Sequence, residues 1–430
     1  PSGLGQLTKR NAYNQNVSKS LRFRSSASTY MNRTPASTGS QTTASYSFWL
    51  KRGSIGAARP FHTTKISSSG SNATVLQFNS SDQLQVTFAT TADVNYSNTT
   101  TALYRDPSAW YHVFVVIDTT QASSSDRLKA YVNGTLISSY SASSVPPQNA
   151  TLRLSNSSFP MNIGTDPRDG TYYDGYMSEV YFVDGQALTP SSFGETNSDG
   201  VWMPKSYTGT YGTNGFYLPF TDTTSTTTLG YDSSGNGNNF TTNNFSLTAG
   251  VNYDSMIDSP TDYASAGDYA TFNPSATNSS GSTFSIGNLR VVTPSSGDTS
   301  VAGTIFASSG KWYCEFLVED VGAAGSAVGL VDLNMPSATS PGLSANSYGY
   351  TSDGTKRNNS VSTAYGNTWT TNDTVGIALD LDNGKIWFSK NGTWQASGDP
   401  ASGTNAAFTG VVGPLAPAWG DRSSAATTQA

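Results

Sequence analysis

The stretch GIALDLDNGKIWFSKNGTW, residues 376–394, predicts an antiparallel hairpin followed by a second tight turn. Asn383-Gly384 is a dipeptide that tolerates two consecutive positive φ values, as a two-residue type I′ turn requires. Asn391-Gly392 predicts the second turn in the same way. The first turn sets a register whose opposed pairs are Asp382 and Lys385, Leu381 and Ile386, Asp380 and Trp387, and Leu379 and Phe388.

This register separates apolar from polar side chains along the hairpin. One face carries Ile377, Leu379, Leu381, Ile386 and Phe388. The other carries Asp380, Asp382, Lys385 and Ser389, with Trp387 as its one large apolar group. A slip of one residue would turn the apolar set to the wrong side, so the pattern and the turn agree. We therefore expect an antiparallel sheet with one buried face and one face in water.

The composition extends this expectation to the whole chain. Its 430 residues favour two domains over one. Charged residues are only 12%, about half the usual share, so Ser, Thr, Asn and Gly must cover the surface. Such a surface suits β-sheet and argues against long exposed helices, which draw on Glu, Lys and Arg. We predict an all-β fold of two antiparallel β-sandwiches.

Charge and cysteine usage exclude several classes of function. The formal net charge of −6 and the absence of a basic run interleaved with aromatics argue against a nucleic-acid partner. No stretch of about 18 apolar residues predicts membrane insertion. No signal peptide is visible, although a mature chain would have lost one. Cys314 is the single cysteine, so no disulfide forms within the chain, and its strand-like surroundings suggest a small core side chain.

Turn signals and apolar runs divide the chain into four parts. Residues 1–20 are polar and predict an attachment arm, 21–220 the first sandwich, 221–300 a linker with surface loops, and 301–430 the second sandwich. The most basic part of the chain is its start, with Lys9, Arg10, Lys19, Arg22, Arg24 and Arg33. This cluster is either an electrostatic dock for another protein or a solvated arm.

Four segments of the first sandwich resemble the concanavalin A-like jelly rolls of the LamG/pentraxin superfamily. They are ASYSFWLKRG (44–53), AWYHVFVVID (109–118), DRLKAYVNGTLI (126–137) and YYDGYMSEVYFVDGQALTPSSF (172–193), in the order of that family. The resemblance implies a concanavalin A-like sandwich over about 200 residues.

The second sandwich resembles the SPRY (B30.2-like) domain. The matching segments are GKWYCEFLVE (310–319), SAVGLVD (326–332), YGYTSDGTKRNN (348–359) and NDTVGIALDLDNGKIWFSKNGTW (372–394). The family closes with a further strand, whereas GDRSSAATTQA (420–430) is polar and strand-poor. The closing strand is therefore expected to be missing, or to be supplied by another element.

Catalytic residues are in short supply. Glycosidases usually need two carboxylates that flank the scissile bond, yet glutamate occurs only at Glu179, Glu195, Glu315 and Glu319, with no paired strand signature. Two histidines and one cysteine are too few for a zinc site, and His112 is expected to be a hydrogen-bonded sandwich residue. We predict no enzyme and no catalytic residue.

Two kinds of binding site remain as candidates. Asp166, Asp169 and Asp174 share one turn-rich segment, and the LamG resemblance implies calcium at such a loop end; the alternative is that Asp simply favours turns. No other cofactor is expected. Tyr and Trp join a stackable face to a polar edge, and the candidate ligand-binding residues are Tyr172, Tyr173, Tyr348, Tyr350, Tyr365 and Trp369.

The two domains together resemble the fibre and appendage proteins of tailed bacteriophages. This resemblance implies a virion surface protein whose arm, residues 1–20, attaches to other virion proteins. Its sandwich loops are expected to bind host surface glycans or neighbouring subunits. It is also expected to form a homo-oligomer, a trimer. The alternatives are a secreted or cell-surface carbohydrate-binding adhesin and a degraded glycanase.

Overall fold

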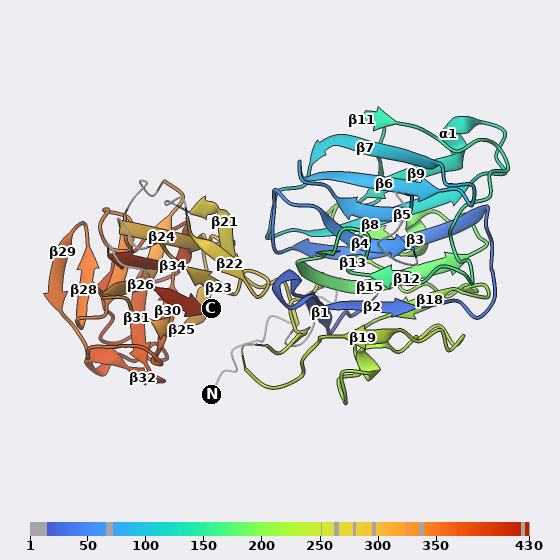
Figure 1. Ribbon diagram of the computed structural model, residues 1–430. Coiled ribbons are helices and arrows are strands. Elements are labelled where there is room, and N and C mark those ends of the chain that lie inside the picture. Colours follow the sequence, from blue (N-terminus) through green and yellow to red (C-terminus); the bar gives the residue numbers. More distant parts are fainter. Residues whose placement is uncertain are drawn as a thin grey trace, which may run out of the picture. The chain divides into compact units, whose positions relative to one another are not determined.

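The computed structural model describes residues 15–65, 72–250, 252–261, 266–277, 281–294, 298–323, 325–334, 339–422 and 426–429. The chain divides into two compact units, Pro1–Asp268 and Tyr269–Ala430. Each unit contains two large sheets in which all paired strands run antiparallel (Figure 1). The predicted all-β fold of two sandwiches is confirmed. No helix in the described ranges is long and apolar enough to cross a bilayer.

Unit 1 is built from two eight-stranded sheets. Sheet 1 runs in the order β10 (Thr135–Leu136), β9 (Leu128–Val132), β8 (Trp110–Asp118), β3 (Thr43–Arg52), β15 (Gly175–Asp184), β1 (Ser20–Phe23) and β20 (Ser255–Met256), with β18 (Phe216–Leu218) also on β15. Sheet 2 runs in the order β11 (Tyr140–Ser143), β7 (Asn95–Leu103), β6 (Gln83–Ala89), β5 (Thr74–Phe78), β4 (Arg59–Thr64), β12 (Met161–Ile163), β2 (Tyr30–Arg33) and β19 (Thr241–Asn243).

Short elements complete unit 1. They are the pair β13 (Thr165–Asp166) and β14 (Thr171–Tyr172), the pair β16 (Gly194–Thr196) and β17 (Trp202–Pro204), the helical turn α1 (Ser124–Arg127), and the 3₁₀ turns η1 (Ser25–Ala27), η2 (Pro190–Ser192) and η3 (Thr228–Gly230).

The central strands of sheet 1 are buried on both faces. Strand β15 has no exposed residue, and β3 is buried from its second residue onward. One face enters the main core, which includes Phe48, Val113 and Phe182. The other face is covered by separate clusters around Phe114 and around Trp49. A simple alternation of buried and exposed residues therefore does not apply to this sheet.

The linker predicted for 221–300 is wrong. Leu229, Phe240 and Phe245 belong to the core of unit 1, and the strands of 269–303 belong to unit 2. Small polar residues dominate this part of the sequence. A few large apolar side chains are enough to attach it to a core, because burying each of them stabilises the fold.

Ion pairs connect the last residues of unit 1 to its first strands. The Asp254 carboxylate has no exposed surface and accepts from Arg24 Nε at 2.7 Å and from Arg22 Nε at 3.3 Å. Lys51 Nζ lies 2.8 Å from Asp258 and 2.7 Å from Asp268. Burial raises the pKa of Asp258 to about 6, and this effect outweighs the attraction to Lys51, which lowers the pKa. These pairs hold Asp254, Asp258 and Asp268 against sheet 1.

The basic cluster at the start of the chain therefore has a structural role where it is described. Arg22 and Arg24 pair with Asp254, and Arg33 donates to Asn238 Oδ1 at 2.6 Å. Lys9, Arg10 and residues 1–14 of the predicted arm lie outside the described residues. Residues 15–20 do not form a free arm, because Val17 is buried and its N–H donates to Thr261 Oγ1 at 2.9 Å.

Unit 2 contains a seven-stranded and an eight-stranded sheet. Sheet 3 runs in the order β21 (Phe272–Thr277), β24 (Asp298–Gly303), β34 (Leu415–Arg422), β26 (Ser326–Asp332), β27 (Ser347–Thr351), β28 (Thr355–Asn358) and β29 (Val361–Ala364). Sheet 4 runs in the order β22 (Thr283–Ser285), β23 (Arg290–Val292), β35 (Thr427–Gln429), β25 (Lys311–Asp320), β30 (Thr374–Asp380), β31 (Lys385–Lys390) and β32 (Thr393–Trp394), with β33 (Phe408–Thr409) on β31 and the 3₁₀ turn η4 (Gln395–Ser397) after β32.

The second sandwich has its closing strand, contrary to expectation. Strand β35 pairs with β25 on one side and with β23 on the other. Thr428 is fully buried and its hydroxyl donates to Leu317 O at 3.0 Å. A run of Thr is polar in composition but well suited to a strand, because a β-branched side chain fits the pleated surface.

The hairpin of 376–394 forms, but its first turn differs from the prediction. Asp380 pairs with Lys385 and Ile377 with Phe388, two residues away from the predicted register. The Asp380 carboxylate accepts from the Asn383 N–H at 3.0 Å, which favours a four-residue loop in place of the type I′ turn. A shift of two residues leaves every side chain on its predicted face.

The second turn is confirmed. Asn391 and Gly392 have φ of 48° and 76° and join Lys390 to Thr393 directly. The prediction of a face in water is wrong, since Trp387 is 1% exposed and its indole N–H donates to Thr404 O at 2.7 Å. Residues that follow the hairpin in sequence cover this part of its polar face.

Candidate functional site

The outer face of sheet 1 carries a stack of three rings. His112 on β8 lies between Trp49 on β3 and Trp202 on β17, with ring centroids 5.1 and 5.8 Å apart. Trp202 Nε1–H donates to His112 Nδ1 at 2.9 Å, so the proton of the neutral ring sits on Nε2 and is donated to Ser47 Oγ at 2.8 Å. Burial lowers the pKa of His112 to about 3. This Ser–His pair therefore holds the imidazole as a neutral structural group.

Glu179 is a buried carboxylate of the same sheet. It lies at a bulge in β15 with φ of 50° and is 3% exposed. Its Oε2 accepts from the hydroxyls of Tyr181 at 2.7 Å and Tyr217 at 2.8 Å, and from the Gln15 amide. Burial raises the pKa of Glu179. All of these partners belong to the packed interior of unit 1, which indicates a structural role.

The three aspartates predicted to bind calcium do not form one site. Arg168 occupies the Asp166 carboxylate, with Nη2 to Oδ2 at 2.5 Å. Asp174 is 9% exposed, and its Oδ1 accepts from the Ser25 N–H at 3.3 Å. Across the described residues no group of three or more His, Cys, Asp or Glu side chains is arranged to hold a metal ion. The calcium prediction is therefore not supported, since turn geometry accounts for these residues.

The aromatic candidates of unit 1 differ in exposure. Tyr173 has no exposed surface and its hydroxyl donates to Lys51 O at 3.0 Å, so it is a core residue. Tyr172 is half-buried on β14, 6.1 Å from the ring of Tyr30.

Most aromatic candidates of unit 2 also lie in the core. Tyr348, Tyr350 and Trp369 are all buried and belong to the hydrophobic cluster between sheets 3 and 4. Tyr365 differs, because it is half-buried and lines a pocket. Its ring packs on the buried Tyr350 at 5.5 Å.

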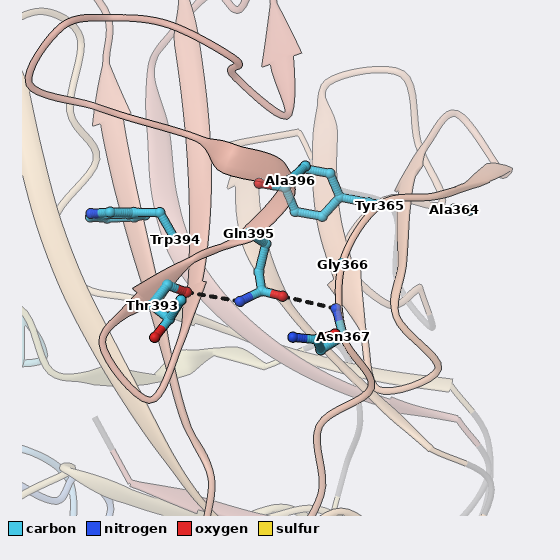
Figure 2. Close-up of a pocket in the computed structure, with 8 residues that line it drawn as sticks. All are labelled: Ala364, Tyr365, Gly366, Asn367, Thr393, Trp394, Gln395 and Ala396. Carbon is cyan, nitrogen blue, oxygen red and sulfur yellow. Dashed lines mark hydrogen bonds between the residues drawn. The ribbon is translucent and has the colours of Figure 1, made fainter.

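This pocket lies between residues 364–367, which are the end of β29 and the loop after it, and residues 393–396 of β32 and η4 (Figure 2). Its volume is about 480 Å³. The Gln395 side chain joins the two walls, with Oε1 accepting from the Asn367 N–H at 2.8 Å and Nε2 donating to Thr393 O at 2.8 Å. Gly366 permits the close approach, since a Cβ there would lie 2.8 Å from Gln395 Oε1.

The sequence analysis missed two aromatic residues at this place. Trp394 lines the pocket, and Tyr313 on β25 lies with its ring 6.1 Å from the Trp394 ring in an edge-to-face arrangement. Tyr313 is 56% exposed. The sequence signal was the alternation along β25, which places Tyr313 on the face opposite to the core residue Phe316. Their meeting depends on the pairing of β25, β30, β31 and β32, which local patterns do not reveal.

Comparisons with known proteins agree with both folds. Residues 25–192 match the Laminin_G_3 family, described as the concanavalin A-like lectin/glucanases superfamily, and residues 311–425 match the SPRY domain family. No curated protein matches the chain.

Several solved structures resemble part of the chain. The SPRY domain of human HERC1 is 18% identical, covers 37% of this chain and 95% of its own, and has a TM-score of 0.29. A human SPRY domain is 19% identical, with coverages of 33% and 89% and a TM-score of 0.28. Stonustoxin is 19% identical, with coverages of 37% and 26% and a TM-score of 0.29. On its family matches and its architecture, the chain joins a concanavalin A-like domain to a SPRY domain.

Proposed function

We propose that the chain is a non-enzymatic recognition protein of a bacteriophage particle, either a tail fibre or a capsid-attached appendage. The observation that carries the proposal is the succession of a concanavalin A-like and a SPRY domain in one charge-poor chain. Each fold family hosts many functions, so the argument also depends on the sites that these two domains contain.

The chemistry-bearing groups of unit 1 support binding over catalysis. Both ring nitrogens of His112 are engaged by Ser47 and Trp202, and Glu179 is enclosed by tyrosine hydroxyls. A general base must reach the proton that it abstracts, whereas His112 has no exposed surface and Glu179 is 3% exposed. The same arrangement serves a stable scaffold well.

The single cysteine supports a virion setting. Recognition domains that work outside cells often depend on disulfides, which form in oxidising compartments. Burial raises the pKa of the Cys314 thiol to about 12, which keeps it an unreactive thiol. A particle protein folds in a reducing cytoplasm and meets the exterior only after lysis. We therefore place the chain on the virion surface, with host glycans and neighbouring subunits as its partners and no nucleic acid.

Immunogold electron microscopy tests this setting. An antibody raised against the whole chain is applied to purified particles and to intact cells from the source culture. Label on the tail or capsid supports the proposal. Label confined to the cell surface would favour the alternative, a carbohydrate-binding adhesin. Label on neither would contradict both.

We further propose a homotrimer, the arrangement common among phage fibres. Light scattering on the purified chain should then give about three times the chain mass of 45.3 kDa. A mass equal to one chain at micromolar concentration would refute the trimer and leave the recognition role untouched.

A further inference from the structure

The pocket between 364–367 and 393–396 has the size of a small-ligand site. Its volume of about 480 Å³ falls within the roughly 300–1,000 Å³ that such sites occupy. Two aromatic side chains, Tyr365 and Trp394, meet several polar groups there (Figure 2). These are the general features of a site that orients a small polar ligand.

The walls of the pocket are held before any ligand arrives. Gln395 is 4% exposed and bonds to both walls. Ala396 and Ser397 have φ of 52° and 57°, a conformation that costs a residue with a Cβ about 1 kcal/mol or more. Such backbone strain persists only where the surroundings enforce it. A pocket held in this way loses little conformational freedom when it binds.

Three polar groups at the pocket are available to form hydrogen bonds with a ligand. The indole N–H of Trp394, the side-chain amide of Asn367 and the hydroxyl of Thr393 make no hydrogen bond within the described part of the chain, and each lies on a residue with exposed surface. In Figure 2 Thr393 and Asn367 lie on either side of Gln395. The pocket thus offers both hydrogen-bond donors and acceptors.

Aromatic surface continues beyond the pocket. The Tyr313 ring meets Trp394 at 6.1 Å and an interplanar angle of 70°. Gly376 lies beneath Tyr313, since a Cβ there would come within 2.9 Å of the Tyr313 hydroxyl oxygen. That hydroxyl donates to Glu315 Oε1 at 2.5 Å, which fixes the ring. A ligand that leaves the pocket therefore meets a second stackable ring and a carboxylate.

The charges around the pocket favour a neutral ligand. None of the pocket-lining residues is charged. The nearest cation along the chain, Lys390, is already bonded to Asp373 at 3.1 Å and to Thr368 O at 2.9 Å. Glu315 adds negative charge beside the aromatic rings. Lys356 Nζ lies 5.7 Å from the centroid of the Tyr365 ring, where it already donates to Ala407 O. A phosphate or sulfate group would therefore find no cation among the residues that line the pocket.

We infer that this pocket and the adjoining Tyr313 bind a neutral sugar unit of a glycan, with Trp394 as the stacking residue. A pyranose ring presents an apolar C–H face to an indole and hydroxyls to amide, hydroxyl and carboxylate groups, which matches the set assembled here. This inference rests on the proposed recognition function and assigns it a location on unit 2.

Printed arrays of oligosaccharides test the inference with the full chain. The array carries neutral gluco-, galacto- and manno-configured oligosaccharides beside sialylated and sulfated ones. Wild type is expected to bind neutral sugars, and Trp394→Ala to lose affinity about tenfold or more. Asn367→Ala, an exposed position, gives a second variant with no change in the core. Trp312→Ala is the matched control, because Trp312 is 48% exposed on the same unit but does not line the pocket.

The outcomes separate this inference from the proposed function. Loss of binding in Trp394→Ala and in Asn367→Ala, with Trp312→Ala unchanged and all variants folded by circular dichroism, supports the site. Neutral-sugar binding that survives in folded Trp394→Ala and Asn367→Ala overturns the site but leaves glycan recognition standing. Binding of acidic glycans alone, or of none, also overturns the inference. Immunogold labelling of particles is unaffected by either result.

Discussion

Replacing Asp254 by alanine should destabilise unit 1 severely. The Asp254 carboxylate is fully buried and accepts from Arg24 Nε at 2.7 Å, Arg24 Nη2 at 2.9 Å, Arg22 Nε at 3.3 Å and the Ser246 N–H at 2.9 Å. The side chains of Arg22 and Arg24 are only 2% and 9% exposed. Without the carboxylate, two cations would remain in a site that water reaches poorly.

The expected cost follows from this geometry. Removing one partner of a buried ion pair typically costs about 3–5 kcal/mol, because the remaining charge stays desolvated. Here one carboxylate serves two arginines, so we expect the upper part of that range. For a unit of this size 1 kcal/mol corresponds to roughly 2–4 °C in Tm. The Tm of unit 1 should therefore fall by about 10 °C or more.

Differential scanning calorimetry of the full chain measures this effect. Asp126→Asn is the matched control, since Asp126 pairs with Lys129 at 2.8 Å and the two side chains are 47% and 33% exposed. An exposed pair contributes about 0–1 kcal/mol, so the control should shift the Tm by less than about 4 °C. Equal shifts for the two variants, or no shift for Asp254→Ala, would refute a structural role for Asp254 in unit 1.

Three further predictions concern pH and turn geometry. Burial raises the pKa of Asp258 to about 6, so its ionisation opposes folding, and the free energy of unfolding should fall as the pH rises from about 4 to about 6.5. Asp258→Asn should reduce this fall when the free energy of unfolding is measured with urea at each pH. An unchanged dependence on pH in the variant would contradict the prediction. The pKa of His112 is about 3, so its ring signals in NMR should not titrate between pH 5 and 8, whereas a midpoint near 6.5 would show that the ring is solvated. Asn391 has a φ of 48°, so Asn391→Ala should be about 1 kcal/mol less stable than Asn391→Gly in chemical denaturation. At position 383 the alanine variant should be no less stable than the glycine variant. The same ranking at both positions would refute the assigned turns.

The two Asn-Gly turns show how far local sequence reaches. Both dipeptides predict a type I′ turn, and Asn391-Gly392 forms one. At Asn383-Gly384 the Asp380 side chain bonds to the Asn383 N–H and amide and stabilises a longer loop. A side-chain hydrogen bond of about 1 kcal/mol is enough to decide between two turns of similar energy. The faces of the strands were still predictable, because the shift was even.

Long-range pairing accounts for the larger errors. Residues 221–300 look like a linker because their composition is polar. The buried partners of Asp254 and Asp258, which include Arg22 and Lys51, lie some 200 positions earlier in the sequence. The pocket combines residues from β29 and β32, which lie in different sheets. No single sequence motif could therefore predict that Trp394 lines it. Of the aromatic candidates only Tyr365 lines it, since most large rings in a sandwich fill the core.

The claim that this chain binds glycans without cleaving them can be tested in one measurement. The full chain is incubated with purified bacterial O-antigens, capsular polysaccharides and peptidoglycan sacculi, and bound protein and released reducing ends are measured in the same samples. We predict that protein is retained on at least one polysaccharide while reducing ends stay at the level of the protein-free control. Reducing ends that increase with time and protein concentration would show an enzyme, and retention on none of the polysaccharides would contradict glycan recognition.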